Sequence, residues 1–234
     1  MKDLNQEMRI IIDESFPATE RLEPIYDGII DIEAYAQSRY KVAWILKEPH
    51  DEVGEDGRPE GGGWFIADGY KDGTKRLYPM HLTLAQISYC IANKKKVVTK
   101  QELDDARMRD LMLYFKALGY LNISKYPAFT RSSDRAIEKI YSEKKKVILR
   151  QIEMMNPDIV VYCAGDTLFD RYIKSDFRLN DRDMESNDTV SFYIDASGKL
   201  IIQADHPSRR AAKADYVNGI LDAVSRWESG NAGK

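Results

Sequence analysis

The chain has 234 residues, 43% of them hydrophobic and 31% charged, which is typical of a soluble globular protein with a sizeable core. Its formal net charge of −3 provides no overall field that attracts nucleic acid, and its two cysteines exclude a disulfide framework or a cluster held by four thiolates. No stretch approaches the roughly 20 apolar residues of a membrane span, and no signal peptide is evident, so we expect a single cytoplasmic domain.

The first part of the chain predicts a helical extension followed by a buried strand. Residues 1–38 are expected to form two helical pieces, because Phe16-Pro17 and Pro24 interrupt the pattern. The apolar run 42–46 has no polar alternation, which is typical of a strand covered on both faces in a parallel sheet.

The segment 53–79 is rich in glycine and has no useful periodicity. A loop of this length in a compact domain indicates a lid or a binding loop, and we expect it to cover the functional site. Its aromatic residues Trp64 and Phe65 either anchor the loop to the body of the protein or stack on a ligand.

The rest of the chain alternates helices with strands. Helices are expected at 80–92, at 100–118 with Gly119 as C-cap, from the caps Ser132 and Ser133 to Asn156-Pro157, at 167–174 and at 211–227; strands are expected at 120–123, 159–164, 190–194 and 199–204; 175–189 is expected to be loop and 229–234 a frayed tail. This alternation predicts a three-layer α/β/α domain with a central, mostly parallel sheet of about four strands.

Polar residues follow four of the expected strands. They are Lys47-Glu48-Pro49-His50-Asp51, Asn122-Ile123-Ser124-Lys125, Gly165-Asp166-Thr167 and Asp205-His206-Pro207-Ser208. A single polar residue at a strand end is more often a cap than a functional group. Parallel strands, however, end at one edge of the sheet, and ligands bind beyond the carboxyl ends of such strands. The four ends together therefore predict a site at that edge.

Three of these strand ends resemble motifs of the uracil-DNA glycosylase superfamily. They are Glu48-Pro49 after the first strand, Asn122 in LNISKYP after the second, and His206-Pro207-Ser208 after the last core strand. The stretch NPDIVVYCAGD also looks like the family's third strand and its glycine turn. The resemblance spans residues 41 to about 220. It implies the family's α/β fold and hydrolysis of the N-glycosidic bond of uracil or another damaged base in DNA.

The resemblance and the residue types together suggest roles. Glu48 would orient water and stabilise the positively charged sugar, and His206 would donate a hydrogen bond to the departing base. Asn122 would read the base edge. Further base-binding candidates are Phe65, Trp64, His50 and Lys47, and candidates for contact with nucleic acid are Ser208, Arg209, Arg210 and Lys125. The chemistry needs no metal or cofactor, and we expect a monomer whose partner is DNA.

The sequence also departs from the family pattern, and other functions stay open. Leu46 stands where the family usually has a glycine, and Arg209-Arg210 stands where it often has an apolar wedge. A non-catalytic or differently catalytic nucleotide- or nucleic-acid-binding protein on the same fold is the alternative. A metal hydrolase using His50, Asp51, Asp205 and His206 lacks ligands at helical spacing, and a serine hydrolase lacks the G-x-S-x-G elbow.

Overall fold

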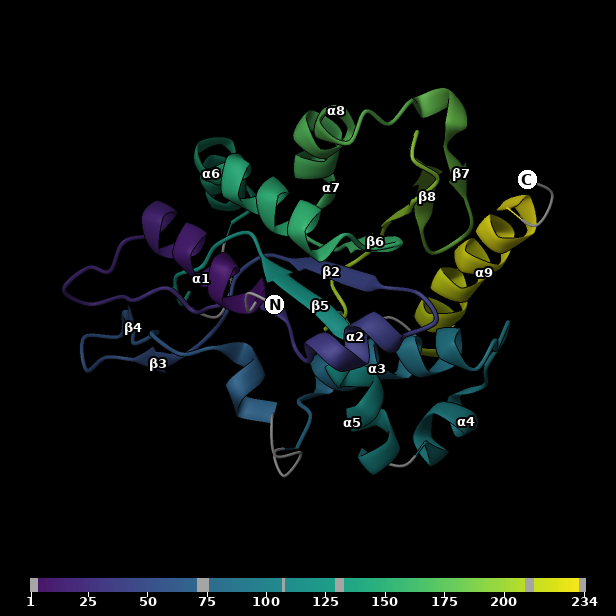
Figure 1. Ribbon diagram of the computed structural model, residues 1–234, viewed down its shortest axis with the longest axis horizontal. Coiled ribbons are helices and arrows are strands. Elements are labelled where there is room, and N and C mark those ends of the chain that lie inside the picture. The colour runs from purple at the N-terminus through teal and green to yellow at the C-terminus, as the bar shows by residue number, and fades with distance from the viewer. Residues whose placement is uncertain (1–3, 71–75, 107, 129–132, 209–212, 232–234) are drawn as a thin grey trace.

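The computed structural model describes residues 4–70, 76–106, 108–128, 133–208 and 213–231 (Figure 1). About half of the chain is helical, and the described residues form a mixed seven-stranded sheet in the order β1-β5-β2-β6-β9-β8-β7. The strands, in that order, are Gly28–Ile29, Leu118–Asn122, Val42–Leu46, Ile159–Tyr162, Leu200–Gln203, Ser191–Ile194 and Glu185–Ser186. A separate hairpin joins β3 (Glu52–Val53) and β4 (Pro59–Glu60).

The four middle strands of the sheet are parallel. β2 pairs in parallel with β5 and β6, and β6 pairs in parallel with β9. β1 and β8 pair antiparallel with the outer strands of this group, and β7 pairs antiparallel with β8. The expectation of about four strands therefore describes the parallel centre, whereas three antiparallel strands widen the sheet to seven.

β2 lies at the centre because both of its faces are apolar. All five of its residues are buried, and alternate side chains belong to different hydrophobic clusters. Trp44 packs in one cluster with buried residues of α3 (Pro79–Ala92), α5 (Met108–Lys116) and α9 (Lys213–Asn231). Ala43 and Ile45 pack in the other with residues of α1 (Leu4–Ser15) and α6 (Asp134–Met155). Figure 1 shows α1 and α6 on one side of the sheet and α3 and α5 on the other.

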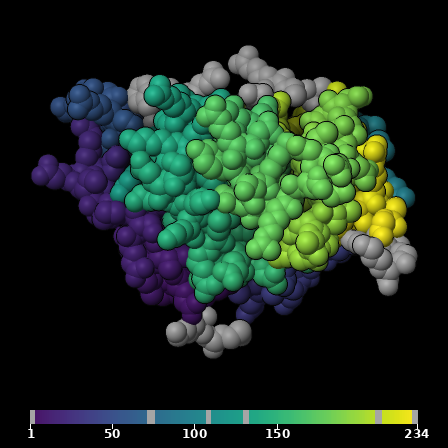
Figure 2. All heavy atoms as spheres, turned by 90° about the horizontal axis from the view of Figure 1, so that it is seen from above, coloured from purple at the N-terminus to yellow at the C-terminus, as the bar shows by residue number. Residues whose placement is uncertain are grey.

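After α6 and β6, the chain forms several short helices on the same side of the sheet as α1 and α6. It passes through α7 (Asp166–Leu168), a π-helical turn η2 (Phe169–Ile173) and α8 (Lys174–Asp176), and the short 3-10 helix η3 (Asp181–Asp183) precedes β7. In the space-filling view α1, α6 and this segment lie next to one another on one face of the molecule (Figure 2). α6 has the ends that the sequence predicts, because the Ser133 hydroxyl caps its first turn and Asn156 ends it with φ 45°.

Residues 100–118 differ from the single helix that the pattern predicts. They form α4 (Lys100–Asp105), which begins with a capping box at Thr99, and α5, which ends at Lys116. Gly119 is not a C-cap but a residue of β5, where an added Cβ would lie 3.2 Å from the Cβ of Ala43 on β2. The Met155 Sδ on α6 would lie still closer to that added Cβ, at 2.9 Å, so the glycine leaves room for α6 against the sheet. Pairing with β2 begins at Leu118, so the strand starts earlier than expected.

The two ends of the chain also differ from expectation. Residues 1–38 are not helical throughout, because β1 separates α1 from α2 (Ile32–Gln37). On α1, the Asn5 side chain donates to the Ile29 carbonyl over 2.7 Å and accepts from the Ile29 N–H over 3.1 Å. α9 extends to Asn231, so 229–231 is helical rather than frayed. No helix in the described part of the chain has the length and apolar character to cross a bilayer.

Candidate functional site

The polar strand ends lie along one edge of the sheet. The carbonyls of Leu46 and Lys47 accept the N–H groups of Ile123 and Ser124, over 3.0 and 2.9 Å, which aligns the ends of β2 and β5. The Ala204 N–H donates to the Tyr162 carbonyl over 2.9 Å, which aligns the ends of β9 and β6. Asn122, Glu48 and His206 therefore belong to the same edge. Neighbouring strands are about 4.8 Å apart, so the β2 and β9 ends are separated by about 10 Å.

Glu48 lies in an extended exit from β2 that is tied to the exit from β5. Its side chain is half-buried. The carbonyl of the following Pro49 accepts the Ala128 N–H over 3.0 Å, and the His50 Nδ1 lies 3.1 Å from the Ala128 carbonyl oxygen. These bonds fix the course of the chain on either side of Pro49. The backbone that carries the predicted catalytic carboxylate is therefore fixed at the strand end.

Asn122 has a buried side chain whose amide makes no hydrogen bond of good geometry with the described residues. It ends β5 with 1% exposure, on the face that also carries Leu118 and Tyr120. Its amide lies next to the Tyr120 hydroxyl, whose pKa is raised by burial and then by Asp27, while the amide opposes that rise. Among the described residues neither amide atom has a hydrogen-bond partner of good geometry. An amide without such partners is able to bind a polar ligand. Because the side chain is buried, a ligand reaches it only if the side chains around it move.

The backbone of Asn122 is held by a buried ion pair. Its N–H donates to Asp27 Oδ2 over 2.6 Å, and its carbonyl accepts from Lys125 Nζ over 2.6 Å. Lys125 Nζ also lies 2.7 Å from Asp27 Oδ1, and Gln151 on α6 donates to that oxygen over 3.0 Å. Desolvation lowers the pKa of Lys125, although the charge of Asp27 opposes it. These residues position Asn122.

This arrangement corrects the expectation that Lys125 contacts nucleic acid. Lys125 and Asp27 both have 0% of their side chains exposed, so the ammonium group cannot meet a phosphate from solvent. The sequence contained no signal for the pairing, because Asp27 lies 98 residues earlier in a segment that was expected to be helical. The role of Gln151 was also missed, because it lies within a helical pattern far along the chain from Asp27.

His206 lies in a tight turn that fixes its imidazole. Nδ1 is 2.7 Å from the Ser208 hydroxyl and 3.4 Å from the Ser208 backbone nitrogen. A backbone N–H can only donate, so Nδ1 accepts and the neutral ring carries its proton on Nε2. The preceding Asp205 carbonyl accepts from the Tyr216 hydroxyl on α9 over 2.8 Å. Ser208 thus orients His206, while Arg209 and Arg210 lie outside the described residues.

Lys47 is paired within the protein. Its Nζ lies 2.6 Å from Asp134 Oδ1 at the start of α6, and 22% of its side chain is exposed. An added Cβ at Gly165, in the turn after β6, would lie 3.8 Å from the Lys47 Cε. The lysine therefore joins the ends of β2 and β6 to α6. Its contact with a base is still a prediction.

The described part of the 53–79 segment lies beside β1. Residues 61–66 run parallel to 22–26, with bridges at Leu22–Gly61 and Tyr26–Phe65. Trp64, with 38% exposure, donates through Nε1 to Asp51 Oδ2 over 2.8 Å. Phe65 lines a cavity bounded by α1, residues 30–33 and η1 (Ile66–Tyr70). Phe65 thus lies beside Tyr26 next to β1, while Trp64 joins the segment to Asp51 at the exit from β2, and contact of either ring with a base near Glu48 is still a prediction.

No protein-family model matches the chain, and no curated protein matches it. Among the described residues no three histidine, cysteine, aspartate or glutamate side chains are grouped as metal ligands.

Proposed function

We propose that this chain has the three-layer fold of the uracil-DNA glycosylase superfamily and hydrolyses the N-glycosidic bond of uracil or another damaged base in DNA. The observation that supports the proposal best is the alignment of Asn122, Glu48 and His206 at one edge of the parallel strands. A dissociating base leaves positive charge on the sugar and gains negative charge itself, so the reaction needs an acid–base pair on opposite sides of one bond.

Each residue has a role that suits its surroundings. Glu48, as a carboxylate, would orient the attacking water and stabilise the sugar cation. His206 would donate from Nε2–H to a base oxygen, because the contacts from Ser208 leave the proton on that nitrogen. Asn122 would bind the edge of the base with an amide that has no competing partner of good geometry among the described residues.

The direct test is base release from single- and double-stranded oligonucleotides that carry uracil, hypoxanthine or other damaged bases. Glu48→Gln keeps the shape of the side chain and should reduce the release rate by about 10²–10⁴-fold. His206→Asn should reduce it by about 10²–10³-fold, since one donor to the leaving base is lost. Glu52→Gln, at an exposed residue of β3, removes the same charge as Glu48→Gln and should leave the rate unchanged. Equal rates in all three variants would refute the assignment.

A second candidate is a protein that binds a nucleotide or nucleic acid on the same fold without releasing a base. The burial of Asn122 at 1% exposure favours it, because the described conformation does not open the amide to a base. In that case the oligonucleotides would bind without release, and neither Asn122→Ala nor Glu48→Gln would change binding.

A further inference from the structure

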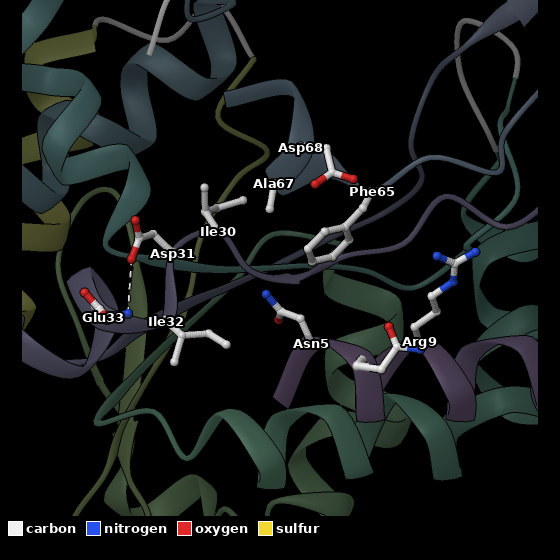
Figure 3. A pocket seen from close by; sticks show the side chains of 10 residues that line it. Asn5, Arg9, Ile30, Asp31, Ile32, Glu33, Phe65, Ala67 and Asp68 are labelled. Atoms are coloured by element: carbon white, nitrogen blue, oxygen red, sulfur yellow. Dashed lines mark hydrogen bonds between the residues drawn. The ribbon is translucent and has the colours of Figure 1, made fainter. Parts of the chain in front are cut away.

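A cavity of about 370 Å³ lies on the outer side of β1, away from the strand ends that the proposed function uses. Three parts of the chain form it: α1, the segment 30–33 and the residues around η1. Figure 3 shows the ring of Phe65 turned toward the side of the cavity where Ile30, Ala67 and Asn5 lie. The volume falls within the range of about 300–1,000 Å³ that is common for small-molecule sites.

The apolar part of the cavity is built on rigid residues. Ile30 and Ala67 are buried at 7% and 2% exposure, and Phe65 packs against both hydrophobic clusters. The backbone around Phe65 is fixed, since the Ile66 N–H donates to the Tyr26 carbonyl over 2.9 Å. The cavity therefore presents an aromatic ring whose orientation is set by the core.

The charged part of the lining is mainly negative. Asp31, Glu33 and Asp68 contribute carboxylates, and Arg9 contributes the one positive charge among the lining residues. The Arg9 guanidinium lies 4.3 Å from the centre of the Tyr26 ring, and its Nε lies 4.0 Å from Asp13. Its charge is thus partly balanced by a carboxylate of its own helix.

Two of the carboxylates have no cationic partner among the described residues. Asp31 Oδ1 accepts the N–H groups of Glu33 and Ala34, each over 3.0 Å, which holds the carboxylate at the start of α2. Neither Asp31 nor Glu33 forms an ion pair within the described part of the chain. An aromatic ring beside uncompensated carboxylates attracts a cation through both its face and the local charge.

We propose that this cavity binds a small organic cation with a flat or apolar body. The body of the ligand lies against Phe65 and Ile30, and its positive group points toward Asp31, Glu33 and Asp68. The same lining disfavours an anion, so this cavity differs in ligand class from a site for DNA.

Three probes of nearly equal shape test the charge preference: benzamidinium, benzamide and benzoate. Their binding is measured on the full chain at low salt by NMR titration of the isoleucine methyl groups, in which Ile30 and Ile32 report on the cavity itself. Benzamidinium should bind about tenfold more tightly than benzamide, as two carboxylates at about 6 Å in a high dielectric would produce, and benzoate should bind most weakly. Added salt should reduce the difference.

Variants separate the charge from the apolar contact. Asp31→Asn with Glu33→Gln removes the two charges that have no cationic partner among the described residues, and asparagine keeps the N-cap of α2, so the variant should bring the affinities for benzamidinium and benzamide close together. The control is Glu143→Gln with Glu153→Gln, which removes the same charge from exposed positions on α6 outside the cavity. Phe65→Leu should weaken both probes alike.

Several results would overturn the proposal. Absence of any shift at Ile30 and Ile32, equal binding of the three probes, or tighter binding of benzoate would each do so. So would a charge preference that persists in the Asp31 and Glu33 double variant or that disappears in the α6 control.

Discussion

At the scale of single residues, the buried pair of Asp27 and Lys125 is the feature most sensitive to change. Both charges are fully buried, and each is bonded to the backbone of Asn122 as well as to its partner. Removal of one partner leaves the other as an uncompensated buried charge. The loss of stability in a single variant therefore comes mainly from the charge that is left buried, and less from the lost attraction between the two residues.

We expect Asp27→Asn and Lys125→Met each to lower the free energy of unfolding by about 3–5 kcal/mol. The double variant should recover most of that loss, because no net charge stays buried. Urea unfolding of the four proteins measures the coupling. Two small, additive losses would contradict the prediction, since residues in one buried network do not behave independently.

At the scale of elements, the sequence predicts the parts whose own residues determine their structure. β2 and β6 are continuous apolar runs, and α6 carries its own caps, so all three lie where expected. β1 has two residues and exists through its pairing with β5, which no local pattern encodes. The start of β5 was missed in the same way, because residues 118–119 gain their strand structure from contact with β2.

The candidate site, too, was predictable only in part. The shared edge follows from the order of helices and strands, so the placement of Glu48, Asn122 and His206 on it was predictable. The burial of Lys125 and the position of Phe65 were not. Both depend on the segment 21–27, whose partners are far along the chain and whose own sequence was interpreted as part of a helical extension.

The glycine-rich segment yields a prediction at this scale. Gly62 has φ +100°, and an added Cβ would lie 1.9 Å from the Glu23 carbonyl oxygen, whereas Gly57 has φ +74° and open space around it. Gly62→Ala should therefore detach residues 53–70 and speed limited proteolysis there. Gly57→Ala serves as the control, because it has the backbone strain without the clash and should cost only about 1 kcal/mol. Equal proteolysis of the two variants would argue against this packing.

At the scale of the whole molecule, the negative net charge makes any contact with DNA depend on local positive charge. Arg209→Ala with Arg210→Ala should weaken DNA binding and reduce the slope of its salt dependence by about 1–2. Lys94→Ala with Lys96→Ala removes two exposed charges after α3 and is the control. Filter binding at several salt concentrations measures both. Unchanged binding in the arginine variant would indicate that the two arginines pair within the protein, for example with Asp215.

The two buried thiols should make the stability of the protein depend on pH in the alkaline range. Burial raises the pKa of Cys90 to about 11 and that of Cys163 to about 12. The unfolded chain ionises these groups near their ordinary value of 9.0, so its free energy falls first. The contribution of the thiols to stability should therefore be constant below that pH and decrease as the pH rises toward 11. Urea midpoints across this range test it, and replacing both cysteines by alanine should make the decrease less steep.

The contact between Asn5 and β1 has a consequence for the behaviour of the protein at high concentration. A sheet with an open edge is a template on which other chains add strands, and this is a common route to aggregation. The Asn5 amide occupies both hydrogen-bonding groups of Ile29, which face outward from that edge. Light scattering during mild heating should therefore begin earlier for Asn5→Ala than for the parent protein, as the uncovered edge recruits neighbouring molecules.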